Sequence, residues 1–441
     1  MQMLEHKIYG RGVKQKERFK GFELYIRFED GISRWVRRDD IKLISGPTIP
    51  TKPTESQPPL LSAEQFKARQ IIEALKLGIV PHSDIGKFTF GRHNEINQIN
   101  SWLSCPDDGT MVITGEYGSG KTHFLEYIYS IALKENWAVS IVNLNPGELS
   151  FHQPKKMYEY IINSFKFKAK DGNFREFLRE IANNHDFYKL NEHQYLNRAI
   201  DIIRNEADEE DFWEWIEGKP GWYDYPQMHD SSTCANIYCY LLSGIGWAVK
   251  NILGLNGFLI LFDEGESVDS SWYTSYQNKN TQNYLTGLIL MANNDKRLVK
   301  EVQKNKFYQH RTYKGWWGSN TGLQYCGRSQ LPFLWNNPCC VKNILAFTPD
   351  FSILDKGPFN MAKELKLEQI GNDAILREIS EKIIEIYKQA YDYKGNIHIS
   401  EISEIVKFVP KHNIRKFIKG IVEALDLMRF YPDKSMEELV R

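Results

Sequence analysis

The sequence contains few cysteines, no excess of charge of either sign and no long apolar run. Its 441 residues include six cysteines, too few for a disulfide-stapled extracellular scaffold. Fifty-six basic residues balance 56 acidic residues, which excludes a strongly basic nucleic-acid coat but leaves room for a local basic patch. Apolar stretches such as Leu241–Ala248 fall well short of the roughly 20 residues of a spanning helix. The first residues carry charge where a signal peptide needs an apolar run. These absences predict a soluble, cytoplasmic protein of two or three domains.

Residues 1–45 have the pattern of a small β domain. Leu24–Phe28 alternates apolar and polar residues, and Glu-Asp-Gly at 29–31 gives a turn before a second strand begins at Ser33. Residues 46–62 hold five prolines in 17 positions, a composition that favours an extended chain and cannot bury a core. The sequence therefore predicts a β domain at 1–45 and a proline-rich linker at 46–62.

Beyond the linker, strand-like runs alternate with helix-like patterns, which is typical of a parallel α/β sheet. A capping box that begins at Ser62 starts the first helix. Four apolar strands are predicted, at Met111–Thr114, Val139–Leu144, Phe258–Phe262 and Asn343–Phe347. Residues 151–235 read as a mostly helical insertion, and the tail reads as amphipathic helices. We therefore expect an α/β core at 63–350 and a C-terminal helical domain at 351–441.

Residues 115–122 fit G-x-x-x-x-G-K-[ST], the pattern of a phosphate-binding loop. The predicted site residues are Gly115, Glu116, Tyr117, Gly118, Ser119, Gly120, Lys121 and Thr122. Glycines let backbone N–H groups point inward around an anion at a helix N-terminus. In such loops the lysine reaches the β- and γ-phosphates and the threonine hydroxyl ligates Mg²⁺. The pattern predicts ATP and Mg²⁺ as ligands and Lys121 as a catalytic residue.

Two carboxylates follow the apolar run at Phe258–Phe262. We expect Asp263, at the strand tip, to hold Mg²⁺ and Glu264 to polarise the attacking water. Glu266 is a weaker candidate for either role. Thr348 follows the next predicted strand and would contact the γ-phosphate or the water, or is simply a strand-end threonine. Arg415 would reach the phosphates from the helical tail, or lies on a helix surface.

Several spaced motifs resemble a known family. Residues 71–81 read Ile-Ile-Glu-Ala-Leu-x-x-Gly-x-Val-Pro, residues 90–95 read Phe-Gly-Arg-x-x-Glu, and residues 115–125 extend the loop through His-Phe-Leu. Together they resemble the ATP-binding domain of bacterial BREX phage-defence ATPases, particularly the D-type protein. That family lies among the AAA+-like P-loop ATPases, close to the origin-recognition and STAND groups. The resemblance covers about 63–430 and implies a parallel sheet with a helical lid, ATP hydrolysis and a role in anti-phage defence.

The N-terminal unit resembles a different family. Leu-Glu-His-Lys-x-Tyr-Gly-x-Gly-Val at 4–13, with Ile-x-Phe-x-x-Gly at 26–31, is similar to the SH3/Tudor-like barrel that closes UvrD-type helicases. In those proteins the module contacts RNA polymerase or nucleic acid. Here residues 1–45 carry 11 basic and 7 acidic residues, a net charge of +4. Arg34, Arg37 and Arg38 cluster on or beside one strand, as a contact surface or as a solvated strand edge.

A weaker signal lies in residues 302–349, which contain no acidic residue but six basic ones and a series of aromatic residues. Members include Arg311, Tyr325, Arg328 and Lys342. Basic residues between flat rings suit a surface that stacks bases and contacts phosphates. The same composition would also suit a protein partner or a buried core, and these alternatives stay open.

We therefore predict an ATP-hydrolysing AAA+-like switch or motor in a bacterial anti-phage assembly, with DNA or defence proteins as partners. One alternative is a helicase-loader or clamp-loader ATPase of replication or repair, and another is a non-hydrolysing nucleotide-sensing scaffold. Glu264 argues against the scaffold, because a sensor needs no water-activating carboxylate. We also expect hydrolysis to depend on assembly into an oligomer or complex, with Arg328 or Arg311 offered to a neighbouring subunit as an arginine finger.

Overall fold

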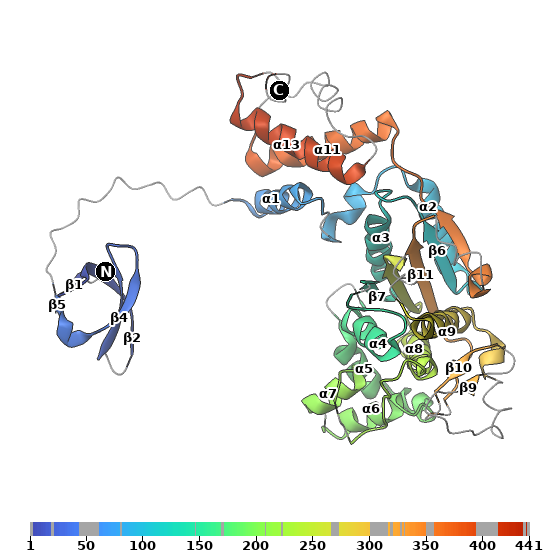
Figure 1. The fold of residues 1–441 in the computed structure, drawn as a ribbon. Helices are drawn as coiled ribbons and strands as arrows, with labels where there is room; N and C mark the ends of the chain where they lie inside the picture. The colour runs from blue at the N-terminus through green and yellow to red at the C-terminus, as the bar shows by residue number, and fades with distance from the viewer. Residues whose placement is uncertain are drawn as a thin grey trace. The chain divides into compact units, whose positions relative to one another are not determined.

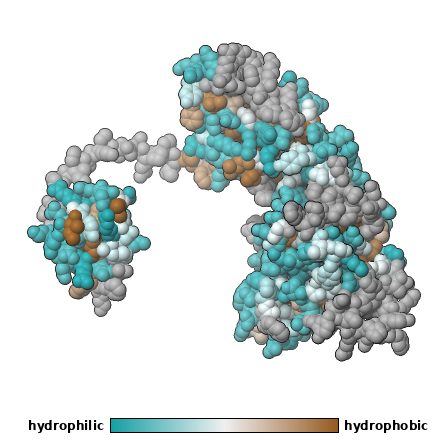
Figure 2. Space-filling view, viewed as in Figure 1, coloured by the Kyte–Doolittle hydropathy of each residue, from teal (hydrophilic) through white to brown (hydrophobic). Residues whose placement is uncertain are grey.

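The structure is a computed structural model, and its chain divides into two compact units, Met1–Ser62 and Ala63–Arg441 (Figure 1). It describes residues 3–18, 22–43, 61–79, 82–145, 147–168, 172–207, 209–221, 224–265, 273–299, 316–317, 321–326, 329, 331–349, 357–393, 413–434 and 438. The visible surface of these residues is mostly hydrophilic, with small apolar patches (Figure 2). Among the described helices, none is long and apolar enough to span a membrane.

The first unit is a curled antiparallel sheet of five strands in the order β4-β3-β2-β1-β5. The strands are β1 (Met3–His6), β2 (Gly10–Arg18), β3 (Glu23–Phe28), β4 (Ser33–Arg37) and β5 (Ile41–Leu43). Alternate residues of β3 and β4 point inward, and their apolar side chains form a small core with Leu4. The predicted hairpin at 24–36 is confirmed, because β3 pairs with β4 across the Glu-Asp-Gly turn.

The second unit is built on a five-stranded parallel sheet in the order β12-β6-β11-β8-β7. Its strands are β6 (Thr110–Thr114), β7 (Ala138–Asn143), β8 (Phe258–Asp263), β11 (Val341–Phe347) and β12 (Lys363–Lys366). Every residue of β6, β8 and β11 is buried, which explains their continuous apolar runs. The four predicted strands are confirmed. The fifth, β12, was not predicted, because this edge strand buries only Leu365 among its four residues.

Helices cover both faces of the sheet. One face packs against α2 (His93–Ser104) and α3 (Lys121–Lys134), and the other against α8 (Ala235–Asn251) and α9 (Ser275–Ala292). The alternation within β8 is plain: Leu259 and Leu261 face α3, whereas Phe258, Ile260 and Phe262 join the larger core. That larger core continues into further helices: α4 (Pro154–Asn163), α5 (Phe174–Asn183), α6 (Leu196–Arg204) and α7 (Glu210–Ile216). The sheet with its helical layers is the predicted α/β architecture.

A three-helix bundle forms the rest of this unit. It contains α1 (Ala63–Lys76), α11 (Asp373–Tyr391) and α13 (Ile414–Phe430), which share one hydrophobic core. The predicted α/β core at 63–350 includes α1, but the buried residues of α1 pack against the C-terminal helices instead. The apolar stripe of α1, at Ala68, Ile71, Ile72 and Leu75, predicts a buried helix face. Such a stripe does not specify which element it packs against.

Candidate nucleotide-binding site

The loop between β6 and α3 requires its glycines. Gly118 and Gly120 have φ values of 86° and 92°, in the left-handed region that favours glycine. A Cβ atom on Gly115 would lie 2.5 Å from the Ser119 hydroxyl oxygen. The Gly115 N–H donates to the Phe347 carbonyl at 3.1 Å, which fastens the start of the loop to the end of β11. The motif therefore matches the backbone that it predicts, a tight turn from a buried strand into a helix.

Polar groups of this loop are available to an anion. Because α3 begins at Lys121, the N–H groups of its first turn have no partner within the helix. The Ser119 hydroxyl is buried and forms no hydrogen bond with any described residue. Lys121 Nζ donates to the Gly115 carbonyl at 2.7 Å and so lies folded over the loop. A buried hydroxyl, the N–H groups at the start of a helix and an ammonium together fit phosphate oxygens.

Two carboxylates lie at the carboxyl end of β8. Asp263 is buried, and its Oδ1 accepts a hydrogen bond of 2.9 Å from the Glu264 N–H. Glu264 has a φ of 55°, an uncommon conformation for a residue other than glycine. That conformation turns the chain sharply after the strand, and both residues line the same cavity. Hard carboxylate oxygens, with the Thr122 hydroxyl, are donors that suit Mg²⁺.

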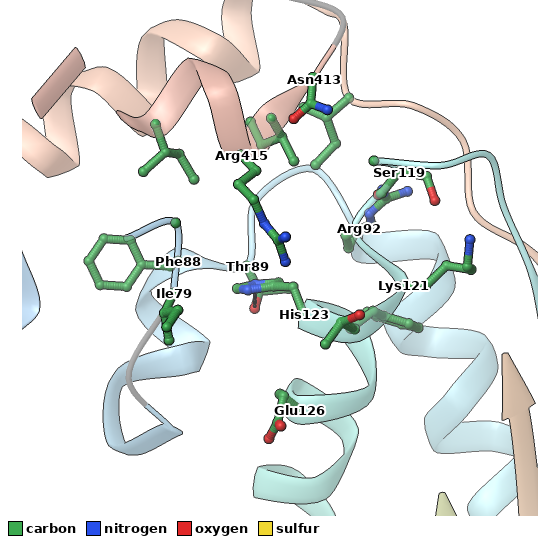
Figure 3. Close-up of a pocket in the computed structure, with 18 of the residues that line it drawn as sticks. Ile79, Phe88, Thr89, Arg92, Ser119, Lys121, His123, Glu126, Asn413 and Arg415 are labelled. Carbon is green, nitrogen blue, oxygen red and sulfur yellow. Dashed lines mark hydrogen bonds between the residues drawn. The ribbon is translucent and has the colours of Figure 1, made fainter. Parts of the chain in front are cut away.

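A cavity of about 820 Å³ lies between the sheet and the helical bundle (Figure 3). Thr348 lines it directly after β11, the strand that separates β6 from β8. Arg415 and Asn413 line it from the start of α13. Nearly all the predicted site residues share this cavity: Tyr117, Gly118, Ser119, Gly120, Lys121, Thr122, Asp263, Glu264, Thr348 and Arg415. Gly115 and Glu116 belong to the loop but do not line the cavity, and Glu266 lies outside the described residues.

One end of the cavity is apolar. Its aliphatic and aromatic lining comes from the segment after α1 and from the bundle, and includes Ile79, Phe88, Ile370 and Ile418. The segment after α1 contains the 3-10 helix His82–Phe88 and ends at α2. Figure 3 shows Phe88 and Ile79 on the opposite side of the cavity from Lys121. The cavity thus joins a cationic, N–H-rich end to an apolar end.

Arg92 is a cavity residue to which sequence analysis assigned no role. Its side chain is 6% exposed. It donates from Nη2 to the Ser119 carbonyl at 2.6 Å and from Nη1 to Glu95 Oε1 at 2.7 Å. Arg92 therefore braces the phosphate loop against the start of α2, from a position 27 residues earlier in the chain. The Phe-Gly-Arg-x-x-Glu pattern was the one signal in the sequence that pointed to this pair.

His123 and Thr89 form a second contact that sequence analysis missed. His123 Nε2 and Thr89 Oγ1 are 3.0 Å apart, and the Thr89 hydroxyl lies 2.9 Å from the Ile85 carbonyl, to which it donates. Burial, together with the positive charge of Arg92, lowers the pKa of His123 to about 4. The imidazole is therefore neutral near pH 7 and holds the segment after α1 against α3.

The start of helix α13 lies next to the loop between β6 and α3. Asn413 caps α13 by accepting from the Lys416 N–H at 3.1 Å. A Cβ atom on Gly118 would lie 3.1 Å from Asn413 Nδ2, so the cap and the loop are neighbours. Gly78, at a φ of 73°, leaves room in the same way for the Arg415 side chain. The start of α13 thus lies beside both the loop and the segment after α1.

The structure separates the members of the basic and aromatic segment 302–349. Lys342 and Tyr325 are buried, so for these two residues the core alternative holds and a nucleic-acid contact is wrong. Tyr325 belongs to the short strand β10 (Gln324–Tyr325), which pairs with β9 (Trp316–Trp317). Lys342 Nζ donates to the carbonyls of Trp102, Cys105 and Asp108 at 3.0, 2.7 and 2.6 Å. Arg311 and Arg328, the candidate arginine fingers, lie outside the described residues.

Comparison with known proteins identifies a family model that matches part of the chain. Residues 64–192 match the model of the family described as "BREX system ATP-binding protein BrxC/D". The matched segment contains all of α1 except its first residue, together with Arg92, the loop 115–122 and α3. No curated protein matches the chain. The match supports the resemblance to BREX ATP-binding proteins and, with it, ATP as a ligand; it does not extend to the N-terminal unit.

Proposed function

We propose that residues 63–441 form an AAA+-like P-loop ATPase that binds ATP with Mg²⁺ and hydrolyses it. The observation that carries the proposal is the shared cavity, where the loop 117–122, Asp263, Glu264, Thr348 and Arg415 converge from separate elements. Parallel strands bring their carboxyl ends to one edge of a sheet, and ligands bind there. The convergence follows from the fold and not from proximity in sequence.

ATP suits the two ends of this cavity. A triphosphate would lie on the loop, where helix N–H groups, the Ser119 hydroxyl and Lys121 supply hydrogen bonds and positive charge. The base would occupy the apolar end near Ile79 and Phe88. A volume of about 820 Å³ lies in the range of small-molecule sites. The BREX ATP-binding match over residues 64–192 supports the same ligand.

Hydrolysis needs a metal, an activated water and stabilised charge. Thr122 and Asp263 are the residues that would hold Mg²⁺, which neutralises charge on the phosphates when bound. Glu264 extends from the sharp turn after β8 and would accept a proton from the attacking water. Thr348 lies between this carboxylate and the loop in strand order, where its hydroxyl would orient the water or touch the γ-phosphate.

This ATPase would work in a BREX-type anti-phage system, as a switch or motor that acts together with DNA or defence proteins. The family match supports this reading. A helicase-loader or clamp-loader ATPase would use the same site, and a scaffold that binds ATP without hydrolysis would not need Glu264. The contacts of α13 with Gly118 and Gly78 suit a switch, because nucleotide on the loop would alter how the bundle packs.

ATP binding and phosphate release test the proposal. In Lys121→Ala, loss of charged hydrogen bonds should weaken ATP binding about 10- to 150-fold by calorimetry. Glu264→Gln should bind ATP within about twofold of the parent, while turnover falls about 10²- to 10⁴-fold. Lys134→Ala, at the exposed far end of α3, and Glu148→Gln, an exposed loop carboxylate, are matched controls. Parental phosphate release in Glu264→Gln would contradict the hydrolytic role of Glu264.

A further inference from the structure

One face of the N-terminal sheet carries paired aromatic rings. In β3 and β4, Leu24, Ile26, Phe28 and Val36 are buried in the core of the unit. The alternate residues of both strands point outward, because side chains in a strand change sides at every residue. Tyr25 and Trp35 are such outward residues, and they lie directly opposite each other in the register. Their ring centroids are 5.1 Å apart, with an angle of 42° between the planes.

These rings are presented to solvent. Trp35 is 39% exposed, and Tyr25 is partly exposed. On the other side of Tyr25, Lys16 of β2 is its partner in the register. Lys16, Tyr25 and Trp35 thus form a row across three neighbouring strands. A small domain has a limited core, and burying two aromatic rings would add to its stability. Leaving the pair exposed to solvent forgoes that stabilisation.

Positive charge surrounds the pair. Arg27 lies opposite Ser33, one step along the face, and Arg37 lies opposite Glu23, one step in the other direction. Arg27, Arg37 and Lys16 are exposed, and none forms an ion pair with a residue that the structure describes. Some other cations of the unit are already paired, as Lys14 is with Glu17 and Arg34 with Asp30. The face therefore offers a stacking platform with three available cations.

We propose that this outward face of β2–β4 binds single-stranded DNA, with Tyr25 and Trp35 stacking on bases while Arg27, Arg37 and Lys16 contact phosphates. Stacking rings and a cationic groove are the two elements of strand binding without sequence preference. In a duplex the base faces are covered by neighbouring bases, so exposed rings gain little there. Aromatic rings can also bind a methylated lysine of a protein partner. Such a positively charged ligand would be repelled by the three cations of this face. Stacking and charge need no 2′-hydroxyl, so a deoxyribose strand satisfies the face.

This inference concerns residues within Met1–Ser62 and does not rest on the nucleotide cavity. It goes beyond the proposed ATPase, because it assigns a ligand and a binding surface to the N-terminal unit. The two proposals can also fail separately. Lys121→Ala should lose ATP and keep DNA, whereas variants of the outward face should lose DNA and keep ATP.

Binding of a fluorescein-labelled deoxythymidine strand of about 20 nucleotides to the full chain, followed by anisotropy, tests the proposal. Tyr25→Ala and Trp35→Ala should each weaken binding about 5- to 150-fold, the loss expected for one stacked base. Trp35→Phe should keep most of the affinity, because a ring remains. Arg27→Ala and Arg37→Ala should each lower the slope of log affinity against log salt by about 0.7, the value for one phosphate of a single strand.

Matched controls distinguish DNA binding by this face from nonspecific binding through exposed cations or exposed aromatic residues elsewhere. Lys42→Ala removes an exposed cation from β5 of the same unit, and Tyr188→Ala removes an aromatic residue that is 53% exposed in the other unit. Both should bind DNA as the parent does. The double variant Arg27→Glu, Arg37→Glu leaves both rings in place and should abolish DNA binding. It tests the proposal even if the alanine variants of the rings fail to fold. Tighter binding of duplex or RNA of the same length, no binding by the parent, or parental affinity in the folded Tyr25→Ala, Trp35→Ala double variant would overturn the proposal.

Discussion

Arg92 offers the sharpest test of how this site is organised, because one buried guanidinium joins the phosphate loop to α2. It donates to the Ser119 carbonyl at 2.6 Å and to Glu95 Oε1 at 2.7 Å. Arg92→Met removes both hydrogen bonds and the charge while keeping much of the apolar stem. Loss of a charged hydrogen bond costs about 1.5–3 kcal/mol. Since the Ser119 contact supports the loop that would hold the phosphates, we expect ATP affinity to fall about 10- to 100-fold.

The two contacts of Arg92 have different readouts. The Ser119 contact should appear in nucleotide affinity, measured by calorimetry with ATP. The Glu95 contact should appear in the melting temperature, because the Glu95 side chain, 14% exposed, loses its partner. Arg92→Lys keeps the charge but lacks the fork that reaches both acceptors, so we expect an intermediate loss. Arg377→Ala, an exposed arginine of α11, should change neither quantity.

His123 gives a third readout that loop packing alone would not produce. Burial, together with the positive charge of Arg92, lowers the pKa of His123 to about 4. The pKa of His123, followed by NMR of the imidazole, should therefore rise in Arg92→Met and stay low in Arg92→Lys. ATP affinity within about twofold of the parent in Arg92→Met, with an unchanged pKa of His123, would refute this account.

Two further predictions concern stability and organisation. Lys342→Met removes the donor to the Cys105 and Asp108 carbonyls and one of two donors to the Trp102 carbonyl, and should lower the free energy of unfolding by about 2–4 kcal/mol in denaturant titrations. Burial also lowers the pKa of Lys342 to about 8, below its ordinary value of 10.5. The unfolded chain then binds more protons above pH 8, so the stability of the parent relative to Lys342→Met should rise between about pH 8 and 10. Removal of residues 1–45, which contain the strands of the N-terminal sheet, should leave an ATP-binding protein whose melting temperature matches that of the full chain; a loss of ATP binding would contradict this.

Local motifs carried most of what the sequence could predict about the site. The loop 115–122 and the pair Asp263 and Glu264 follow apolar runs, and parallel strands bring such strand ends to one edge. Thr348 was placed by the same rule. Arg92 and Thr89 were not, because their contacts with Ser119 and His123 span 27 and 34 residues and leave no periodic pattern.

Composition was a poorer guide than pattern in segment 302–349. Lys342 and Tyr325 belong to a basic and aromatic series, yet both are buried. A lysine is tolerated there because its ammonium meets three carbonyls near the end of α2 and lies 4.5 Å from the Trp102 ring centroid. Those acceptors lie more than 200 residues earlier in the chain. A count of charged and aromatic residues cannot show which of them face inward.

Arg415 extends from the bundle into the cavity. A specific contact of Arg415 with the phosphates of ATP can be distinguished from a general effect of positive charge. The side chain of Arg415 extends from the first turn of α13 into the cavity, toward Thr89 and His123 (Figure 3). Near pH 7 the neutral imidazole of His123 does not repel the Arg415 guanidinium. A cation supplied by the lid would contact the outer phosphates, so its removal should affect ATP more than nucleotides that lack those phosphates.

In Arg415→Ala we therefore expect ATP affinity to fall about tenfold and AMP affinity to change by less than about twofold. Lys416→Ala removes the neighbouring exposed cation of the same helix, and should leave both affinities near the parental values. Gly78→Ala perturbs Arg415 by a second route, because its Cβ atom would lie 2.6 Å from Arg415 Cγ and displace that side chain. It should reproduce the selective loss of ATP. The φ of 73° at this position also strains an alanine, so the melting temperature of the variant is measured beside its affinities. Equal losses for ATP and AMP in Arg415→Ala would place the arginine at the base or in the packing of the lid, and not at the phosphates.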